Sequence, residues 1–173
     1  MYAPIIIFAF NRLEPLKRCV ASLLANNEAA ESDLIVYVDG PRASKEGEAE
    51  KVMAVREYVK TIAGFKSLET HFSEKNRGLG PSLIAGITDV MKRYGRAIIV
   101  EDDLNCSTNF LSFLNQGLVF YQDKKEVFSI SGETVKVKAP KNYDYDNYFA
   151  PRAGCWGWAT WKDRWESVDF ELN

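Results

Sequence analysis

The chain has 173 residues, 46% of them hydrophobic and 27% charged, which is typical of a globular protein with one substantial core. Its formal net charge of −2 offers no basic surface for nucleic acid. The three cysteines are widely spaced and contain no CxxC pair, so neither a disulfide framework nor a zinc site is indicated. We therefore expect a cytoplasmic protein, and we leave open a peripheral association with the inner face of a membrane.

Strands and helices are predicted to alternate over the first 132 residues. The apolar run "PIIIFAF" at 4–10 predicts a buried strand; it lacks a basic flank and is too short for a signal peptide or a transmembrane segment. Further strands are expected at 34–39, 68–73 (a weak one), 97–101 and 127–132. Apolar residues three and four apart predict helices at 13–26, 46–63, 81–94 and about 110–121. This alternation predicts an α/β fold, with a mostly parallel sheet and helices on both faces.

The pattern changes after residue 132. A polar, aromatic and irregular stretch leads to "GCWGWATWKDRW", which predicts a Trp-rich helix. Trp158, Trp161 and Trp165 fall at i, i+3 and i+7, and we expect this stripe to pack in the core. Trp156 lies off the stripe, in a position to stack on a sugar ring. No linker is evident, so we expect one domain overall.

Four polar stretches follow predicted strands. They are "FNR" at 10–12, "VDGPR" at 38–42, "EKNRGLGP" at 74–81 and "EDDL" at 101–104. In open parallel sheets, ligands bind at the carboxyl ends of the strands. This convergence predicts a ligand site there.

The acidic run Glu101-Asp102-Asp103 is the most informative of these stretches. Three like charges repel one another, and burial makes the repulsion more costly. A divalent cation or bound hydroxyl groups would relieve it, and a fully solvated acidic turn is the alternative. Magnesium is often held by only one or two carboxylates together with substrate phosphates, so a single aspartate just past the strand would be enough.

The other stretches are ambiguous when taken alone. In "NRGLGP", Gly78 and Gly80 allow close backbone approach and Arg77 adds charge, which suits either a phosphate site or a simple strand-to-helix turn. Asp39 is either a turn-forming aspartate or an acceptor for a base or sugar group. Arg12 is either a surface arginine or a nucleotide contact.

Taken in order, these motifs resemble GT-A fold glycosyltransferases of the family 2 type and are similar to the N-acetylglucosaminyltransferase I family. The resemblance rests on "FNR", "VDG", "EDDL" followed by a Phe-rich helix, and "GWATWKDRW". It implies a Rossmann-like GT-A fold in which residues 1–132 bind a nucleoside-diphosphate sugar. Residues 133–173 would begin the acceptor-side region, which we expect to be truncated.

The resemblance also implies roles for single residues. Asp103 would hold Mn²⁺ or Mg²⁺ beside the donor diphosphate. The nucleotide-sugar would be bound by Phe10, Arg12, Asp39, Asn76, Arg77, Glu101 and Asp102. Asn11 and Asn76 depart from the family pattern, which has Asp and His there, and these departures leave the base and the donor sugar open.

The implied reaction is a metal-dependent, inverting transfer of a hexosyl or N-acetylhexosaminyl unit to the hydroxyl of a carbohydrate or another acceptor. A UDP-sugar is the favoured donor. The catalytic base of the similar family follows the Trp segment; Asp163, Glu166 and Asp169 are candidates and none is assigned. We expect a fragment with low activity. The alternative is a non-catalytic nucleotide- or carbohydrate-binding module on the same fold.

Overall fold

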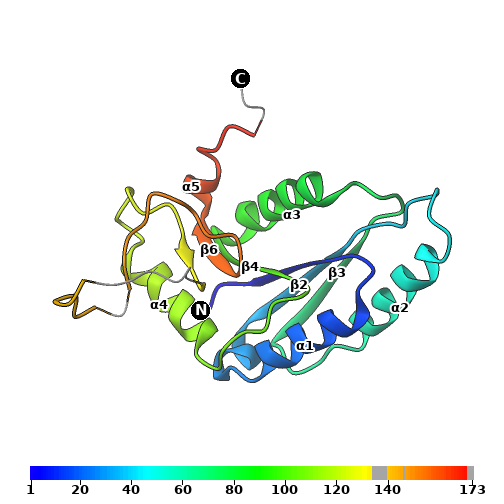
Figure 1. Cartoon of the computed structure of the whole chain (residues 1–173), viewed down its shortest axis with the longest axis horizontal. Coiled ribbons are helices and arrows are strands. Elements are labelled where there is room, and N and C mark those ends of the chain that lie inside the picture. Colours follow the sequence, from blue (N-terminus) through cyan, green and yellow to red (C-terminus); the bar gives the residue numbers. More distant parts are fainter. Residues whose placement is uncertain (134–139, 146, 171–173) are drawn as a thin grey trace.

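The computed structural model, which describes residues 1–133, 140–145 and 147–170, is built on a twisted sheet with helices on both faces (Figure 1). Over these residues the strands are β1 (Ile5–Ala9), β2 (Asp33–Val38), β3 (Ser67–Phe72), β4 (Arg96–Glu101), β5 (Ile130–Ser131) and β6 (Trp158–Trp161). They lie in the order β3-β2-β1-β4-β6-β5. The first four in this order are parallel, β6 is antiparallel to β4, and β5 is antiparallel to β6.

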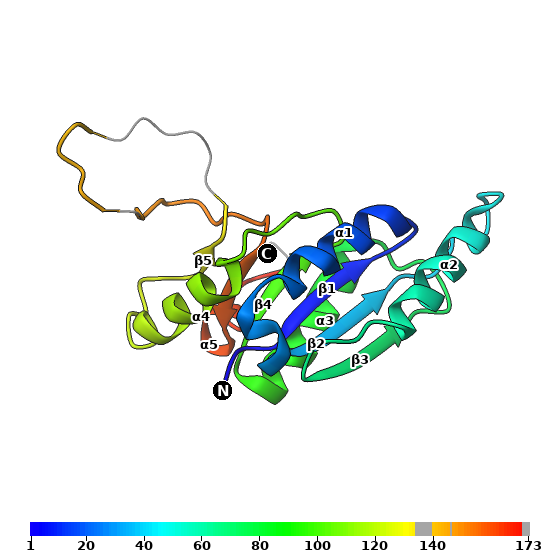
Figure 2. The same cartoon turned by 90° about the horizontal axis from the view of Figure 1, so that it is seen from below.

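Helices cover both faces of the sheet. They are α1 (Leu13–Leu24), the 3₁₀ helix η1 (Asn27–Glu31), α2 (Glu48–Lys60), α3 (Leu79–Tyr94), α4 (Phe110–Phe120) and α5 (Lys162–Trp165). The larger of two hydrophobic clusters joins the sheet to α1, α2 and α4, and the other joins it to α3 and α5. Figures 1 and 2 show the same division into two layers.

The alternation of side chains along β1 explains why its whole length is apolar. Ile5 and Ile7 point into the α1 cluster, whereas Ile6 and Phe8 point into the α3 cluster, and all four are buried. Gly86 lets α3 approach the sheet closely, because a Cβ there would lie 2.8 Å from the Phe8 ring. A strand buried on both faces is what the predicted parallel sheet requires.

The predicted α/β fold is confirmed. Strands within 4–10, 34–39 and 97–101 are parallel neighbours in one sheet, and 68–73 corresponds to β3 at its edge. The predicted strand 127–132 joins the same sheet but is reduced to Ile130–Ser131.

The predicted Trp-rich helix is wrong for most of its length. Residues Trp158–Trp161 form β6, which pairs with β4, and only Lys162–Trp165 is helical. The open edge of β4 needs backbone partners, and this pairing overrides the helical spacing of the tryptophans. As a result Trp158 packs on the α3 side of the sheet and Trp161 on the α4 side. The expected core packing holds for Trp161 and Trp165, which are both buried.

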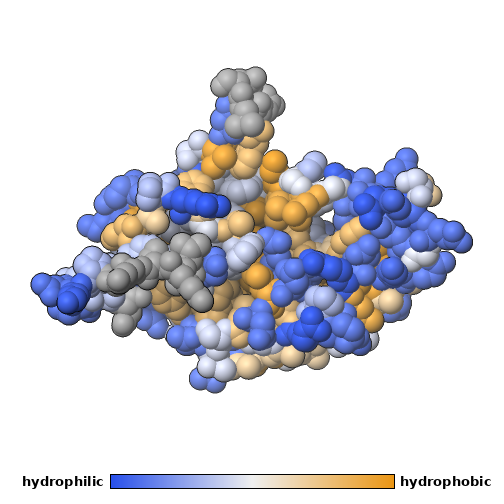
Figure 3. Space-filling model, in the orientation of Figure 1, coloured by the Kyte–Doolittle hydropathy of each residue, from blue (hydrophilic) through white to orange (hydrophobic). Residues whose placement is uncertain are grey.

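Hydrophilic and apolar residues both appear on the face of the molecule drawn in Figure 3. Figure 3 shows hydrophilic residues over α2 and apolar residues gathered where α3 and α5 lie. Among the described residues, no helix has both the length and the apolar character needed to cross a bilayer.

Candidate functional site at the carboxyl end of the sheet

The four predicted loops converge at one end of the sheet. Because β1, β2, β3 and β4 are parallel and in register, their carboxyl ends lie side by side. Ala9 pairs with Val38, Val38 with Phe72, and Phe8 with Glu101. We call this the carboxyl end of the sheet, and the opposite end the amino end.

Arg12 binds two of the three acidic residues. Its Nη1 donates to Oδ2 of Asp103 at 2.8 Å, and its Nη2 donates to Oδ1 of Asp102. The side chain of Asp102 is only 5% exposed, whereas those of Asp103 and Arg12 are 43% and 49% exposed. A backbone hydrogen bond from Phe10 also reaches Asp102. The Arg12 guanidinium therefore neutralises part of the negative charge of the acidic turn. It binds one buried carboxylate, that of Asp102, and one solvent-exposed carboxylate, that of Asp103.

Burial raises the pKa values of two acids of the turn, Asp102 and Glu101. Burial raises the pKa of Asp102 above its usual range, and the Arg12 guanidinium opposes this shift. Burial also raises the pKa of the half-buried Glu101, and the charges of Asp103 and Asp102 add to the effect. The like-charge repulsion expected from the sequence is thus present, and Arg12 compensates part of it.

Asp39 joins two of the loops. Its carboxylate accepts hydrogen bonds from the backbone N–H groups of Gly40, Arg77 and Gly78 at 2.8–3.1 Å and from Asn76 Nδ2 at 3.0 Å. These contacts place a carboxylate where the N-terminus of α3 favours an anion. The backbone groups expected to bind phosphate in "NRGLGP" are therefore already used, at Arg77 and Gly78, by Asp39.

Gly40 is what allows this approach. A Cβ at Gly40 would lie 2.5 Å from the carbonyl carbon of Lys75, so any larger residue would push the two loops apart. Asn76 secures the contact with a second hydrogen bond, from Nδ2 to the carbonyl of Gly40 at 3.0 Å. Asp39, Asn76 and Arg77 thus lie together, and their nucleotide-binding role stays a prediction.

Glu48 is a residue of this region that sequence reasoning missed. Its side chain is 6% exposed and accepts from the backbone N–H and the guanidinium of Arg42 and, at 3.3 Å, from Asn11 Nδ2. The Arg42 hydrogen bonds hold the pKa of Glu48 at about 2. The guanidinium also lies 5.5 Å from the centre of the Phe10 ring. In the sequence, the run of charges at 45–51 looks like a solvated helix start. The only sequence signal for the Arg42–Glu48 pair is an acidic residue in the first turn of α2.

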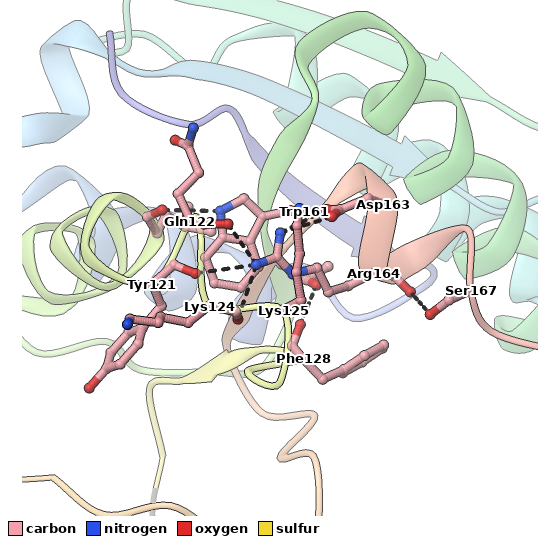
Figure 4. Close-up of polar contacts among 11 residues, drawn as sticks. Tyr121, Gln122, Lys124, Lys125, Phe128, Trp161, Asp163, Arg164 and Ser167 are labelled. Atoms are coloured by element: carbon pink, nitrogen blue, oxygen red, sulfur yellow. Dashed lines mark hydrogen bonds and ion pairs between the residues drawn. The ribbon is translucent and has the colours of Figure 1, made fainter.

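Two of the three base candidates, Asp163 and Glu166, do not lie at the carboxyl end. Trp161 pairs with Arg96, the first residue of β4, so α5 begins at the amino end. The length of β4 separates this end from Glu101 by roughly 16 Å at the usual rise of a strand. Asp163 pairs there with Lys125 and Arg164, which hold its pKa at about 2 (Figure 4). Glu166 and Asp169 are exposed and follow Asp163 along the chain. The structure does not bring Asp163 or Glu166 to the acidic turn.

A large cavity lies outside the acidic turn, and no residue of Glu101-Asp102-Asp103 lines it. It has a volume of about 1650 Å³ and lies between α4, β5 and residues 147–156. Trp156, 56% exposed, lines it. The next residue, Gly157, is close to the turn, because a Cβ there would lie 3.5 Å from the side chain of Leu104. The lining also includes Met1, Tyr2 and Arg96, so the cavity reaches the amino end of the sheet, and only its wall at Trp156 comes near the loop that carries Leu104.

Within residues 1–133, 140–145 and 147–170, no group of three or more His, Cys, Asp or Glu side chains is arranged to hold a metal ion. Asp103 is the acid of the turn with the most exposed position.

No protein-family model matches the sequence, and no curated protein matches it either. Among solved structures, the crystal structure of S. aureus TarS is 16% identical, with a TM-score of 0.47 over 71% of this chain and 20% of that chain. The crystal structure of S. aureus TarS 1–349 is 15% identical, with a TM-score of 0.46 over 75% of this chain and 34% of that chain. This chain thus spans about a fifth and a third of the lengths of those two chains.

Proposed function

We propose that this chain is the donor-binding part of a glycosyltransferase and that it binds a nucleoside-diphosphate sugar at the carboxyl end of the sheet. The observation that carries the proposal is the convergence of four polar loops, one of them the acidic turn, at the carboxyl end of the sheet. Three of these loops supply exposed arginines, Arg12, Arg42 and Arg77. Guanidinium groups suit phosphate oxygens, and the turn offers carboxylates for a cation and for sugar hydroxyl groups.

The donor set at Asp103 fits a hard divalent cation that takes most of its ligands from elsewhere. Mn²⁺ or Mg²⁺ would be held by this one exposed carboxylate together with diphosphate oxygens and water. When bound, the ion would neutralise the charge that develops on the departing nucleoside diphosphate. The buried Asp102 is engaged by Arg12 and by the backbone of Phe10, so we give it a role in shaping the turn beside the ribose or sugar.

The nucleotide would lie over the loops after β1, β2 and β3. Phe10, with the Arg42 guanidinium above its ring, offers an aromatic surface for a base. We propose that Asp39 contributes to base recognition mainly by holding Asn76 and Arg77, since four donors already occupy its carboxylate. Glu101, half-buried at the end of β4, would face the donor sugar. A UDP-sugar carrying a hexosyl or N-acetylhexosaminyl unit is the proposed donor.

The proposed reaction is inverting transfer to an acceptor hydroxyl. The acceptor, a carbohydrate or another hydroxyl compound, would enter along the cavity and stack on Trp156. Residues 133–173 would then serve the acceptor side. A carboxylate must take the acceptor proton, and no residue is assigned to this step.

A non-catalytic nucleotide- or carbohydrate-binding module is the second candidate. It is favoured by the position of Asp163 and Glu166 at the amino end, far from the acidic turn. A module of this kind would bind the donor and leave it intact. Turnover of the donor in the presence of Mn²⁺ therefore distinguishes the two.

The test of donor binding is a calorimetric titration with UDP, GDP, dTDP and CDP, each with and without Mn²⁺. We expect one nucleotide, UDP by preference, to bind and Mn²⁺ to strengthen its binding. Asp103→Asn should remove the Mn²⁺-dependent part, whereas the control Glu166→Gln, on the exposed surface of the amino end, should behave like the parent. If no nucleotide binds under either condition, the proposal is wrong.

A further inference from the structure

We infer that Arg12 is an internal counter-cation of the acidic turn, which competes with the divalent ion for Asp103 and transfers to the donor diphosphate when both ligands bind. The inference rests on the proposed function and concerns the regulation of that site. Its consequence is that the metal and the diphosphate bind cooperatively, each weakly without the other.

The geometry of Arg12 supports the first half of this inference. One guanidinium group spans two carboxylates, with Nη1 on Asp103 and Nη2 on Asp102. A cation bound to Asp103 would share the carboxylate with Nη1 and would meet the positive charge of Arg12 at close range. Arg12 therefore lowers the affinity of the turn for a metal ion that arrives alone.

The unequal exposure of Asp102 and Asp103 indicates which of the two Arg12 contacts breaks more easily. Asp102 is 5% exposed and anchors one branch of the guanidinium, whereas Asp103 is 43% exposed and holds the other branch beside water. An exposed ion pair contributes little to stability and exchanges readily with solvent or ligands. The Nη1 group of Arg12 can therefore leave Asp103 while Asp102 still holds the Nη2 group.

A diphosphate offers the released guanidinium a better partner. Arginine binds phosphate oxygens through paired N–H groups, and its charge compensates that of the ligand. The diphosphate therefore removes the competitor from Asp103 as it supplies its own oxygens to the ion. By linkage, the metal must raise the affinity for the diphosphate by the same factor.

The experiment measures Mn²⁺ affinity by calorimetry on the intact chain, first alone and then with saturating UDP. Arg12→Met keeps the aliphatic stem and removes the charge, and Arg18→Met on the exposed surface of α1 is the matched control. We expect Arg12→Met to bind Mn²⁺ alone about 10-fold more tightly than the parent. We also expect the gain in Mn²⁺ affinity caused by UDP to shrink by about 10-fold, within the usual range of coupling between sites. Arg18→Met should match the parent in both.

Arg12→Lys makes the test independent of any folding defect in the methionine variant. A lysine retains the charge but offers one compact ammonium group, which cannot span two carboxylates as the guanidinium does. With its ammonium group on the buried Asp102, it should leave Asp103 open, so that Mn²⁺ alone again binds more tightly than in the parent.

The outcomes separate the inference from the proposed function. If the parent shows coupled binding of Mn²⁺ and UDP, and both Arg12 variants bind Mn²⁺ alone no more tightly than the parent, the inference is overturned and the proposed function stands. If the parent binds neither ligand in any combination, both are overturned. Tighter binding of Mn²⁺ by both variants, with reduced coupling in Arg12→Met, supports the inference.

Discussion

Glu48 should make the stability of the chain depend on pH. Its hydrogen bonds with Arg42 lower its pKa from 4.5 to about 2 in the folded chain. A carboxylate whose folded pKa is the lower one stabilises the fold above its unfolded pKa, and the contribution is lost as the pH falls through the folded value. The Arg42–Glu48 pair therefore stabilises the fold fully above about pH 4.5 and loses this effect on the way to about pH 2.

We predict that the free energy of unfolding of Glu48→Gln falls less steeply than that of the parent between about pH 6 and about pH 3. Chemical denaturation at a series of pH values measures this. Asp163 has a similarly low pKa but is present in both proteins, so its effect cancels in the comparison. Glu57→Gln, on the exposed side of the same helix, is the control and should follow the parent. Parallel curves for Glu48→Gln and the parent would contradict the prediction.

For single residues, the sequence predicts where a side chain lies in the fold better than it predicts which other residue that side chain binds. Asp39, Asp102 and Asp103 were identified because each follows an apolar strand, and the structure places all three at the carboxyl end of the sheet. The binding of Arg12 to the acidic turn, and of Asp39 to the loop before α3, depends on how close the loops come. That distance is set by packing, for example by the missing Cβ of Gly40, and no local pattern reports it.

Among the elements, α4 is held at its C-terminus by a residue far along the chain. The Nη2 group of Arg164 donates to the carbonyl oxygens of Tyr121, Gln122 and Lys124 at 2.7–3.2 Å (Figure 4). Its guanidinium lies 4.2 Å from the centre of the Trp161 ring and pairs with Asp163. A cation at a helix C-terminus satisfies carbonyl groups that lack helical partners and interacts favourably with the helix dipole.

We predict that Arg164→Met lowers the free energy of unfolding by about 1–3 kcal/mol, the usual cost of leaving buried hydrogen-bonding groups without a partner. The side chain is only 5% exposed, so its loss leaves the carbonyl groups of Tyr121, Gln122 and Lys124 without this donor, whereas Asp163 keeps its pair with Lys125. Urea denaturation provides the measurement. Lys162→Met serves as the control because its pair with Glu166 is long, at 3.8 Å, and half-exposed. Equal losses in the two variants would show that Arg164 does not anchor α4.

The segment 158–161 shows why an element can be misread from spacing. Three tryptophans at helical intervals predicted one helix, yet a strand followed by a short helix places two of them on opposite faces of the sheet. The deciding influence is the open edge of β4, about sixty residues earlier in the sequence, whose backbone groups pair with 158–161. By contrast, β1, β2 and β4 were correctly predicted because burial on both faces leaves an unbroken apolar run.

For the whole molecule, the parallel sheet separates the proposed binding site from a cluster of charged residues that holds helices in place. The acidic turn, the exposed arginines and the Asp39 loop all lie at the carboxyl end. The cluster of Arg164, Asp163 and Lys125 lies at the amino end, where it fixes α4 and α5. A ligand at the carboxyl end should therefore leave the amino end unchanged.

Hydrogen exchange measures this division directly. With UDP and Mn²⁺ bound, we predict slower amide exchange in residues 39–42, 74–78 and 101–104, since backbone groups of these loops line the proposed site. Residues 121–128, which include the carbonyl groups bound by Arg164, should exchange at the same rate with and without ligand. Exchange reports local opening, so a ligand that bridges several loops slows it only in the loops it holds together. The same experiment with Asp103→Asn is the control and should show weaker protection at 101–104. Protection confined to 121–128, or spread evenly over the chain, would place the nucleotide elsewhere.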